Sequence, residues 1–395
     1  MITGDLDRAL ATAISSGGTW QPAPPGTVCG VRAYITTIAF RQARGRTGGP
    51  GGAGTVAARL AARLRDLDWV ETVTVTGGGY LAVTVTPGAL AGLAVRITQA
   101  GPGCARSGAL AGTDLAGPAA TGLASARTWE EARQRVHVAV TARLAETAGA
   151  RIRRDHDAER IAAPHPAAPV TAAWVQPAPA AITSVAAAAR AAAGGPVAEA
   201  LAYAGADAVT YALARLAPRA RAAVDARLAA AHQLGNPAYA VRYAHAHAAS
   251  ALRQAADLGL VRGEAAQFQP WLLAHPAEQA LLHGLSWLPE RVAGAALRAR
   301  PDVFTRFLEG LAQAYFDCQA ACPAVRPGTL APGAAAPDTV LPGRRPQAVP
   351  GGEGLSLAER AALQAGAARL WLAAAARTAL HTGLGLLGVD APDRL

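Results

Sequence analysis

Lysine is absent from this sequence, and all 37 basic residues are arginine. Two kinds of site are excluded as a result. A Walker-type phosphate loop needs a lysine beside its Ser or Thr, and pyridoxal phosphate needs a lysine for its Schiff base. Methionine is nearly as scarce, because Met1 is the single example. Neither a Walker-type phosphate loop nor a pyridoxal Schiff base is available to the chain.

Long apolar runs are missing as well. No run reaches the roughly 18–20 uncharged residues that a membrane helix needs, and the first ten residues lack the charged-then-apolar pattern of a signal peptide. We therefore expect a cytoplasmic protein with no membrane partner.

Cysteine is scarce, and the four cysteines form no Cys-x-x-Cys pair. Cys318 and Cys322 are four residues apart, which places them on one face of a helix. Two small core residues or free thiols fit this spacing better than a metal site. We predict no metal ligand.

The net charge is +10 at pH 7. An excess of arginine suits an anionic partner such as RNA. The excess is spread over both halves of the chain, so charge alone does not require nucleic acid as the partner.

The periodicity of the apolar residues divides the chain into three parts. Residues 1–100 are predicted to form a small α/β domain, with helices at 5–16, 30–44 and 55–66 and a hairpin of strands at 70–76 and 80–86. Residues 101–194 are predicted to be a Pro/Ala-rich linker or degenerate middle segment that holds one helix, at 128–148.

Residues 195–395 have an almost entirely helical pattern. The sequence predicts helices at 196–203, 207–216, 219–232, 239–258, 276–285, 289–300, 302–322 and 357–387. A Pro/Gly-rich insert at 323–354 is expected to be a loop or disordered. The predicted fold class is therefore mainly α, a C-terminal helical bundle with a small N-terminal α/β domain and a Pro/Ala-rich linker.

One motif in the helical part resembles a known family. Residues 235–247 are Gly-Asn-Pro-Ala-Tyr-Ala-Val-Arg-Tyr-Ala-His-Ala-His. They resemble the arginyl-tRNA synthetase motif Asn-Pro-x-Tyr-Tyr-Val-Gln-Tyr-Ala-His-Ala-Arg, which begins that family's helical DALR anticodon-binding domain. Segments 285–290, 308–316 and 383–395 resemble later parts of the same domain, in the same order. The resemblance implies a DALR-type bundle over 195–395.

The first hundred residues resemble the family's N-terminal additional domain. The segment from Gly77 to Leu81 and the Pro-Gly-Ala-Leu that follows its strand are similar to that domain's Gly-x-Gly-Phe-Leu-Asn-x-x-Leu-x-Pro. The resemblance implies a contact with the D-loop of a tRNA through Thr37, Phe40 and Gln42. The position of the family's usual Asn is held by Thr37.

The family's catalytic motifs have no counterpart in this chain. A class I synthetase needs His-x-Gly-His and a Lys-Met-Ser-Lys-type loop, whose side chains stabilise charge on the phosphates. The chain has no His-x-Gly-His and no lysine. We therefore predict no catalytic residue, no ATP or other cofactor, and no arginine activation by this chain alone.

The resemblance implies that the helical domain binds tRNA, with tRNA-Arg as the first candidate. Aromatic and imidazole rings can stack on unpaired bases, and arginines can contact phosphates. The predicted tRNA-binding residues are Asn236, Tyr239, Arg242, Tyr243, His245, His247 and Arg253. Tyr243 could equally be a core aromatic residue, and for Tyr239 the core is the favoured alternative.

Two other functions stay open at this point. The chain could be a protein-interaction or regulatory module in which the old tRNA surface contacts another synthetase or a biosynthetic enzyme. It could also be an arginine–tRNA ligase whose active site is supplied by a partner chain.

Overall fold

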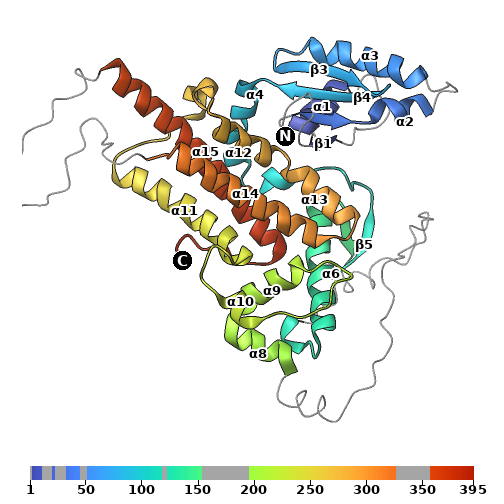
Figure 1. Cartoon of the computed structure of the whole chain (residues 1–395), viewed down its shortest axis with the longest axis vertical. Helices are drawn as coiled ribbons and strands as arrows, with labels where there is room; N and C mark the ends of the chain where they lie inside the picture. Colours follow the sequence, from blue (N-terminus) through green and yellow to red (C-terminus); the bar gives the residue numbers. More distant parts are fainter. Residues whose placement is uncertain are drawn as a thin grey trace, which may run out of the picture.

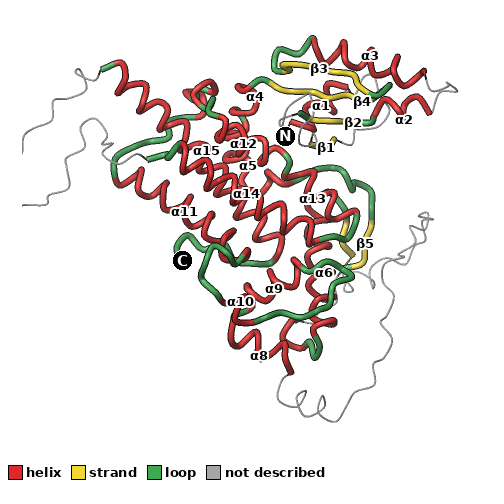
Figure 2. Tube along the Cα trace, in the orientation of Figure 1, coloured by secondary structure: helices red, strands yellow, loops and turns green. Residues whose placement is uncertain are grey.

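The computed structural model describes residues 2–10, 20–22, 33–44, 51–117, 122–153, 195–325 and 356–395. A small α/β part and a larger helical body make up these residues, and the α/β part sits on one side of the body (Figure 1). The tube view shows the same division, with most strands in the α/β part (Figure 2). The fold class predicted from the sequence is confirmed.

The N-terminal part contains a four-stranded antiparallel sheet. Its strands are β1 (Trp20–Pro22), β2 (Tyr34–Thr36), β3 (Val70–Thr76) and β4 (Tyr80–Val85), in the order β1-β2-β4-β3. The accompanying helices are α1 (Ile2–Leu10), α2 (Ile38–Arg44) and α3 (Gly51–Arg65). Leu60, Leu64 and Leu81 are fully buried between sheet and helices. The predicted hairpin is confirmed as β3 and β4.

The prediction of a helix over 30–44 is wrong for residues 34–36. Tyr34–Thr36 is a strand that pairs with β4, and Tyr34 lies opposite Val83. The helix begins only at Ile38, where the Thr36 hydroxyl accepts a hydrogen bond from the Ile38 N–H. Apolar spacing within the segment does not reveal this pairing, because the partner strand lies more than forty residues further along the chain.

The middle of the chain packs against the helical body as far as residue 153. Its elements are α4 (Pro87–Ala91), α5 (Leu93–Ala100), η1 (Gly101–Ala105), β5 (Asp114–Ala116), η2 (Leu123–Ser125), α6 (Trp129–Thr147) and β6 (Arg151–Arg153). Val136, Val140 and Leu144 bury one face of α6. The linker prediction for 101–194 therefore does not hold for 101–117 and 122–153, whereas 154–194 lie outside the described residues.

The helical body contains the remaining elements. They are α8 (Gly195–Ala204), α9 (Ala206–Arg215), α10 (Ala226–Ala230), α11 (Pro237–Asp257), η4 (Ala265–Gln267), η5 (Pro270–Leu272), α12 (Pro276–Ser286), α13 (Leu288–Leu297), α14 (Pro301–Ala321) and α15 (Leu357–Leu387). The predicted helix over 219–232 is wrong, because only Ala226–Ala230 is helical. The insert predicted at 323–354 lies, beyond Val325, outside the described residues.

The long helices α11, α14 and α15 lie side by side at the centre of the body (Figure 1). Small residues make this close approach possible. Ala244, Ala248, Ala375, Ala376 and Ala379 are fully buried, and an alanine at a contact lets two helix backbones approach more closely than a larger side chain would. None of the described helices has both the length and the apolar character that a bilayer crossing requires.

A glycine of α15 lies close against α14. A methyl group at Gly383 would overlap the side chain of Leu308, whereas one at Gly385 would meet nothing within 4 Å. We expect Gly383→Ala to lower the free energy of unfolding by about 1–3 kcal/mol through overpacking. Gly385→Ala is the matched control, and it should raise this free energy by roughly 0.5–1 kcal/mol through helix propensity. Urea denaturation of both variants checks the prediction, and equal midpoints would contradict it.

Candidate functional site

A row of aromatic rings follows one face of α11. The rings of Tyr239 and Tyr243 are stacked, with their centres 5.6 Å apart and an angle of 10° between their planes. His247 continues the row, 6.1 Å from Tyr243. His232, from the preceding loop, stacks on Tyr239 at 5.4 Å, and Phe316 of α14 stacks on Tyr243 at 5.7 Å. We call these five side chains the aromatic row.

The two ends of the aromatic row differ in accessibility. At the inner end, His247 is half-buried, and its Nδ1 is 2.9 Å from the hydroxyl of the fully buried Tyr315. At the outer end, His232 is exposed and Tyr239 is half-buried. Because Tyr243 already contacts three rings of the row, it supports the row from within. A ligand from solvent can reach the row at its His232 end.

Two predicted site residues are buried and serve the protein's own structure. Asn236 is 8% exposed and caps α11, with Oδ1 accepting from the Ala238 N–H. Its amide nitrogen donates to the carbonyls of Ala229 and Ala231. His245 is fully buried, and its Nδ1 donates to the carbonyl of Pro392. Both side chains hold backbone segments in place beside the row.

The two predicted phosphate contacts are engaged with their own chain. Arg242 faces Asp207, with 3.6 Å between Nη2 and Oδ2. Arg253 donates to the backbone carbonyl of Asp393 at 3.0 Å. Each arginine would have to share or leave its partner in order to meet a phosphate.

Three other arginines lie exposed on the segment that leads to the aromatic row. Arg219, Arg221 and Arg227 belong to residues 217–230, between α9 and α11. Within the described part of the chain, none of their guanidinium groups forms an ion pair. We call residues 217–227, which include the first two residues of α10, the arginine loop. It provides three positive charges close in sequence to His232, and these have no ion-pair partner among the described residues.

The arginine loop is held by specific contacts. Arg133 of α6, 9% exposed, donates through Nη1 to the carbonyls of Ala217 and Ala220, at 3.2 and 2.7 Å. Asp225 caps α10 by accepting from the N–H groups of Arg227 and Leu228. These bonds keep 217–225 out of a helix and fix the loop on the body.

Sequence reasoning missed the arginine loop because it assigned 219–232 to a helix. The signal was present nevertheless. Arg219 and Arg221 alternate with small residues directly after a proline, and Asp225 stands at a position that suits a helix cap. His232 and Phe316 were missed for another reason, since they join the row from a loop and from a different helix.

The predicted D-loop residues lie together after β2. Thr37 is exposed, and Phe40 and Gln42 are half-buried. The Phe40 ring packs edge-on against Tyr80 at 5.0 Å, and a Cβ atom at Gly79 would lie 2.9 Å from its Cζ. Phe40 therefore covers the hairpin turn, which leaves Thr37 as the most accessible of the three.

Burial lowers the pKa of three histidines in the helical body, His137, His245 and His247. A lowered folded-state pKa means that the folded protein binds fewer protons than the unfolded chain below pH ~6.5. The contribution of the neutral imidazoles to the free energy of unfolding is therefore fully present above that pH. It is lost as the pH falls through the folded-state values.

We therefore expect these histidines to make the free energy of unfolding decrease between pH 7 and pH 5. Glu290 opposes this trend, because burial raises the pKa of its carboxyl. The variant His245→Asn tests the contribution of one of these histidines, because the asparagine amide can still donate to the Pro392 carbonyl. Urea titrations at several pH values should show a smaller decrease for the variant than for the wild type. An unchanged pH dependence would contradict the prediction.

The buried cysteines and the acidic side chains form no recognisable metal centre. Cys104, Cys318 and Cys322 are buried, and none of them forms a disulfide within the described residues. Among the residues that the structure describes, no group of three or more His, Cys, Asp or Glu side chains is placed to hold a metal ion.

Comparison with known proteins identifies the helical part. Residues 241–328 match the family described as the DALR anticodon binding domain. The arginine–tRNA ligase of Micrococcus luteus is 36% identical over 191 residues, which are 48% of this chain and 29% of the relative. That of Frankia alni is 35% identical over 192 residues, with the same two shares. This chain spans less than a third of the length of these relatives.

A solved structure has the same fold. The arginyl-tRNA synthetase of Thermus thermophilus aligns over 100% of this chain and 99% of its own, with a TM-score of 0.57 and 16% sequence identity. The C-terminal half of this chain is therefore related to the arginine–tRNA ligases, and it contains a DALR anticodon-binding domain.

Proposed function

We propose that this chain binds the unpaired loop of a tRNA, the anticodon region, without activating an amino acid. One observation carries the proposal. The arginine loop, whose three exposed guanidinium groups have no ion-pair partner among the described residues, directly precedes in the chain the accessible His232 end of the aromatic row. Charge for a phosphate backbone and rings for unpaired bases thus lie on neighbouring segments of the chain.

The physical chemistry of these two segments suits single-stranded nucleic acid. Arginines that contact phosphates release condensed counterions, which gives an affinity that falls with salt. Aromatic rings stack on bases in single-stranded loops, each worth about 1–3 kcal/mol. Double-stranded RNA would not offer its bases to the row, because they are already stacked and paired. A loop is therefore the fitting part of the RNA.

The proposal that the chain is non-catalytic rests on its chemistry. Adenylate formation needs side chains that stabilise charge on the phosphates of ATP, and the His-x-Gly-His and lysine-containing loops that do so in class I synthetases are absent from this sequence. The bound tRNA would then be held in the cytoplasm without being aminoacylated by this chain. We propose no ATP site.

A protein partner is the second candidate, and one observation favours it. Tyr203, Leu228 and Leu234 are exposed by 64%, 64% and 59%, and they lie before, within and just after the helix α10 in the chain. Exposed apolar side chains of this size mark interaction surfaces when they gather. Another synthetase or a biosynthetic enzyme could bind there, and a ligase activity would need such a partner to supply an active site.

A binding titration separates these functions. We would measure the affinity of the full chain for tRNA-Arg and for a non-cognate tRNA at two salt concentrations, and test the chain alone for arginine-dependent ATP–pyrophosphate exchange. Tight binding that prefers tRNA-Arg, with no exchange, is the expected result. Weak binding that ignores tRNA identity and disappears with salt would reject the proposal in favour of a protein partner. Exchange activity would reject its non-catalytic part.

A further inference from the structure

Helix α6 makes polar contacts with the C-terminal end of α9. Arg133 and His137 are four residues apart, so they lie on one face of α6. Nε2 of His137 donates to the carbonyl of Leu213 at 3.0 Å. Nη1 of Arg133 donates to the carbonyls of Ala217 and Ala220, at 3.2 and 2.7 Å. A guanidinium group at this end also complements the negative pole of the helix. These contacts therefore fix the place where α9 ends and the arginine loop begins.

Arg133 is not placed to bind RNA itself. The residue is 9% exposed, and its Nη2 donates to the carboxylate of Glu130 on the same helix. A guanidinium group that is buried and paired does not meet a phosphate in solvent. Its influence on a bound RNA has to act through the loop carbonyls that it holds.

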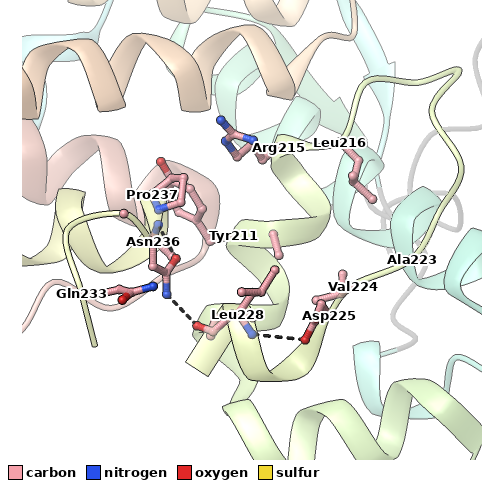
Figure 3. A pocket seen from close by; sticks show the side chains of 15 residues that line it. Tyr211, Arg215, Leu216, Ala223, Val224, Asp225, Leu228, Gln233, Asn236 and Pro237 are labelled. Carbon is pink, nitrogen blue, oxygen red and sulfur yellow. Dashed lines mark hydrogen bonds between the residues drawn. The ribbon is translucent and has the colours of Figure 1, made fainter. Parts of the chain in front are cut away.

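The sequence of the arginine loop favours a helix, which makes its folded conformation informative. Residues 219–232 contain seven alanines and three arginines, which are good helix formers. Pro218 precedes them, and proline suits the first position of a helix. In the structure only Ala226–Ala230 is helical. Figure 3 shows where α10 begins, with the Asp225 carboxylate bonded to the Leu228 N–H. Residues 219–224 are thus kept out of a helix despite their composition.

Packing restrains this part of the loop only weakly. A pocket of about 360 Å³ is lined by residues of α9 and by residues 223–225 (Figure 3). Residues 218–221 are exposed. Because the loop borders a pocket and solvent, it gains little from apolar burial. The hydrogen bonds from Arg133 are therefore the specific restraint on its first half.

We propose that Arg133 is a positioning residue for RNA binding, which holds the arginine loop in the conformation that presents Arg219 and Arg221 to the RNA. The inference rests on the function proposed above. In a helix, two residues that are two positions apart point about 200° apart around the axis. Arg219 and Arg221 would then point in nearly opposite directions, and one strand of RNA could not contact both.

The proposal gives the middle of the chain a part in binding. Without the hydrogen bonds of Arg133, the loop would sample helical and other conformations according to its own propensity. The apparent affinity of a protein falls in proportion to the fraction of molecules in the binding-competent conformation. Helix α6 is then the support of the RNA-binding loop, although it does not touch the RNA.

The test measures the affinity of the full chain for the anticodon hairpin of tRNA-Arg by fluorescence anisotropy at several salt concentrations. The first variant is Arg133→Met, which keeps an unbranched side chain and removes every donor. The matched control is Arg135→Met. Arg135 lies on the same helix, but it pairs with Glu131 and donates to the carbonyl of Gly122, outside the arginine loop. Each variant removes one positive charge from α6, and urea denaturation shows whether each is folded.

We expect Arg133→Met to reduce the slope of log affinity against log salt by about 1.4, because two phosphate contacts of about 0.7 each are lost. At ~0.1 M salt this corresponds to a loss of affinity of about 25-fold. Arg133→Lys keeps the charge and can donate to one carbonyl, so its slope should lie between those of the wild type and Arg133→Met. The control should keep the slope of the wild type. A residue that only stabilises the fold would lower the urea midpoint and leave the slope of the folded protein unchanged.

Three results would overturn the inference. If Arg133→Met is folded and binds with the wild-type slope, Arg133 does not position the loop, although the proposed function stands. If Arg133→Met does not fold, Arg133→Lys decides in the same way, and a wild-type slope counts against the inference. If Arg135→Met lowers the slope as much as the Arg133 variants, the effect does not arise in the loop. A wild-type protein that binds no hairpin would reject the proposed function together with the inference.

Discussion

Replacing Arg219, Arg221 and Arg227 together by glutamine should lower the affinity for tRNA by on the order of 100-fold at ~0.1 M salt. Each phosphate contact with a single strand contributes about 0.7 to the slope of log affinity against log salt. Three contacts together contribute a slope of about 2. Because ~0.1 M salt lies one decade below 1 M, this slope corresponds to an affinity difference on the order of 100-fold. Glutamine keeps most of the side-chain length and removes only the charge.

A charge-matched variant separates local phosphate contacts from the long-range electrostatic attraction between the basic protein and RNA. Arg106, Arg151 and Arg153 are also exposed, and within the described residues their side chains form no ion pair. Their replacement by glutamine changes the net charge by the same amount, away from the arginine loop. It should leave the salt slope nearly unchanged. If both triple variants reduce the slope equally, the RNA is held by diffuse attraction and the arginine loop is not its binding site.

The sequence predicts elements correctly where local periodicity and tertiary packing agree. Strands β3 and β4 alternate apolar and polar residues around a glycine turn, and α11, α14 and α15 repeat apolar residues at helical spacing. The shared face of Tyr239, Tyr243 and His247 follows from the same spacing. In these elements the residues that set the local structure are also those that become buried.

Prediction fails where a distant group decides the conformation. Residues 219–232 are rich in alanine and arginine, both good helix formers, yet Arg133 of α6 binds the carbonyls of Ala217 and Ala220. Tyr34 becomes part of a strand because β4 pairs with it. The candidate site was incomplete for the same reason, since His232 and Phe316 join the row only through tertiary packing.

The substitution Tyr34→Ala should lower the free energy of unfolding by about 3–5 kcal/mol, as expected for a fully buried aromatic residue. Tyr34 belongs to the N-terminal sheet, but its ring stacks on Trp287 at the junction of α12 and α13, with 5.0 Å between the ring centres. Its hydroxyl lies 2.7 Å from Oγ of Ser286. Since Ser286 donates to the carbonyl of His283, the Tyr34 hydroxyl is the donor to Ser286.

Two further variants divide this effect into its parts. Tyr34→Phe keeps the stacked ring and removes only the hydrogen bond, so it should cost about 0.5–1.5 kcal/mol. Tyr203→Ala removes an equally large but exposed ring, and it should change stability by no more than about 0.5 kcal/mol. Urea denaturation followed by circular dichroism provides the comparison. A wild-type midpoint for Tyr34→Ala would show that this ring does not hold the two parts together.

Tyr34→Ala should also affect RNA binding. This second effect should differ between whole tRNA and its anticodon hairpin. Thr37 directly follows β2, so the contact of Tyr34 with Trp287 sets the position of the predicted D-loop surface relative to the helical body. A tRNA that contacts both surfaces gains affinity because the second contact is intramolecular, and this gain depends on their spacing. We expect Tyr34→Ala to weaken tRNA binding by about tenfold or more, measured where the variant is still folded, and to leave hairpin binding unchanged. Equal losses for both RNAs would mean that the N-terminal part makes no separate contact with tRNA.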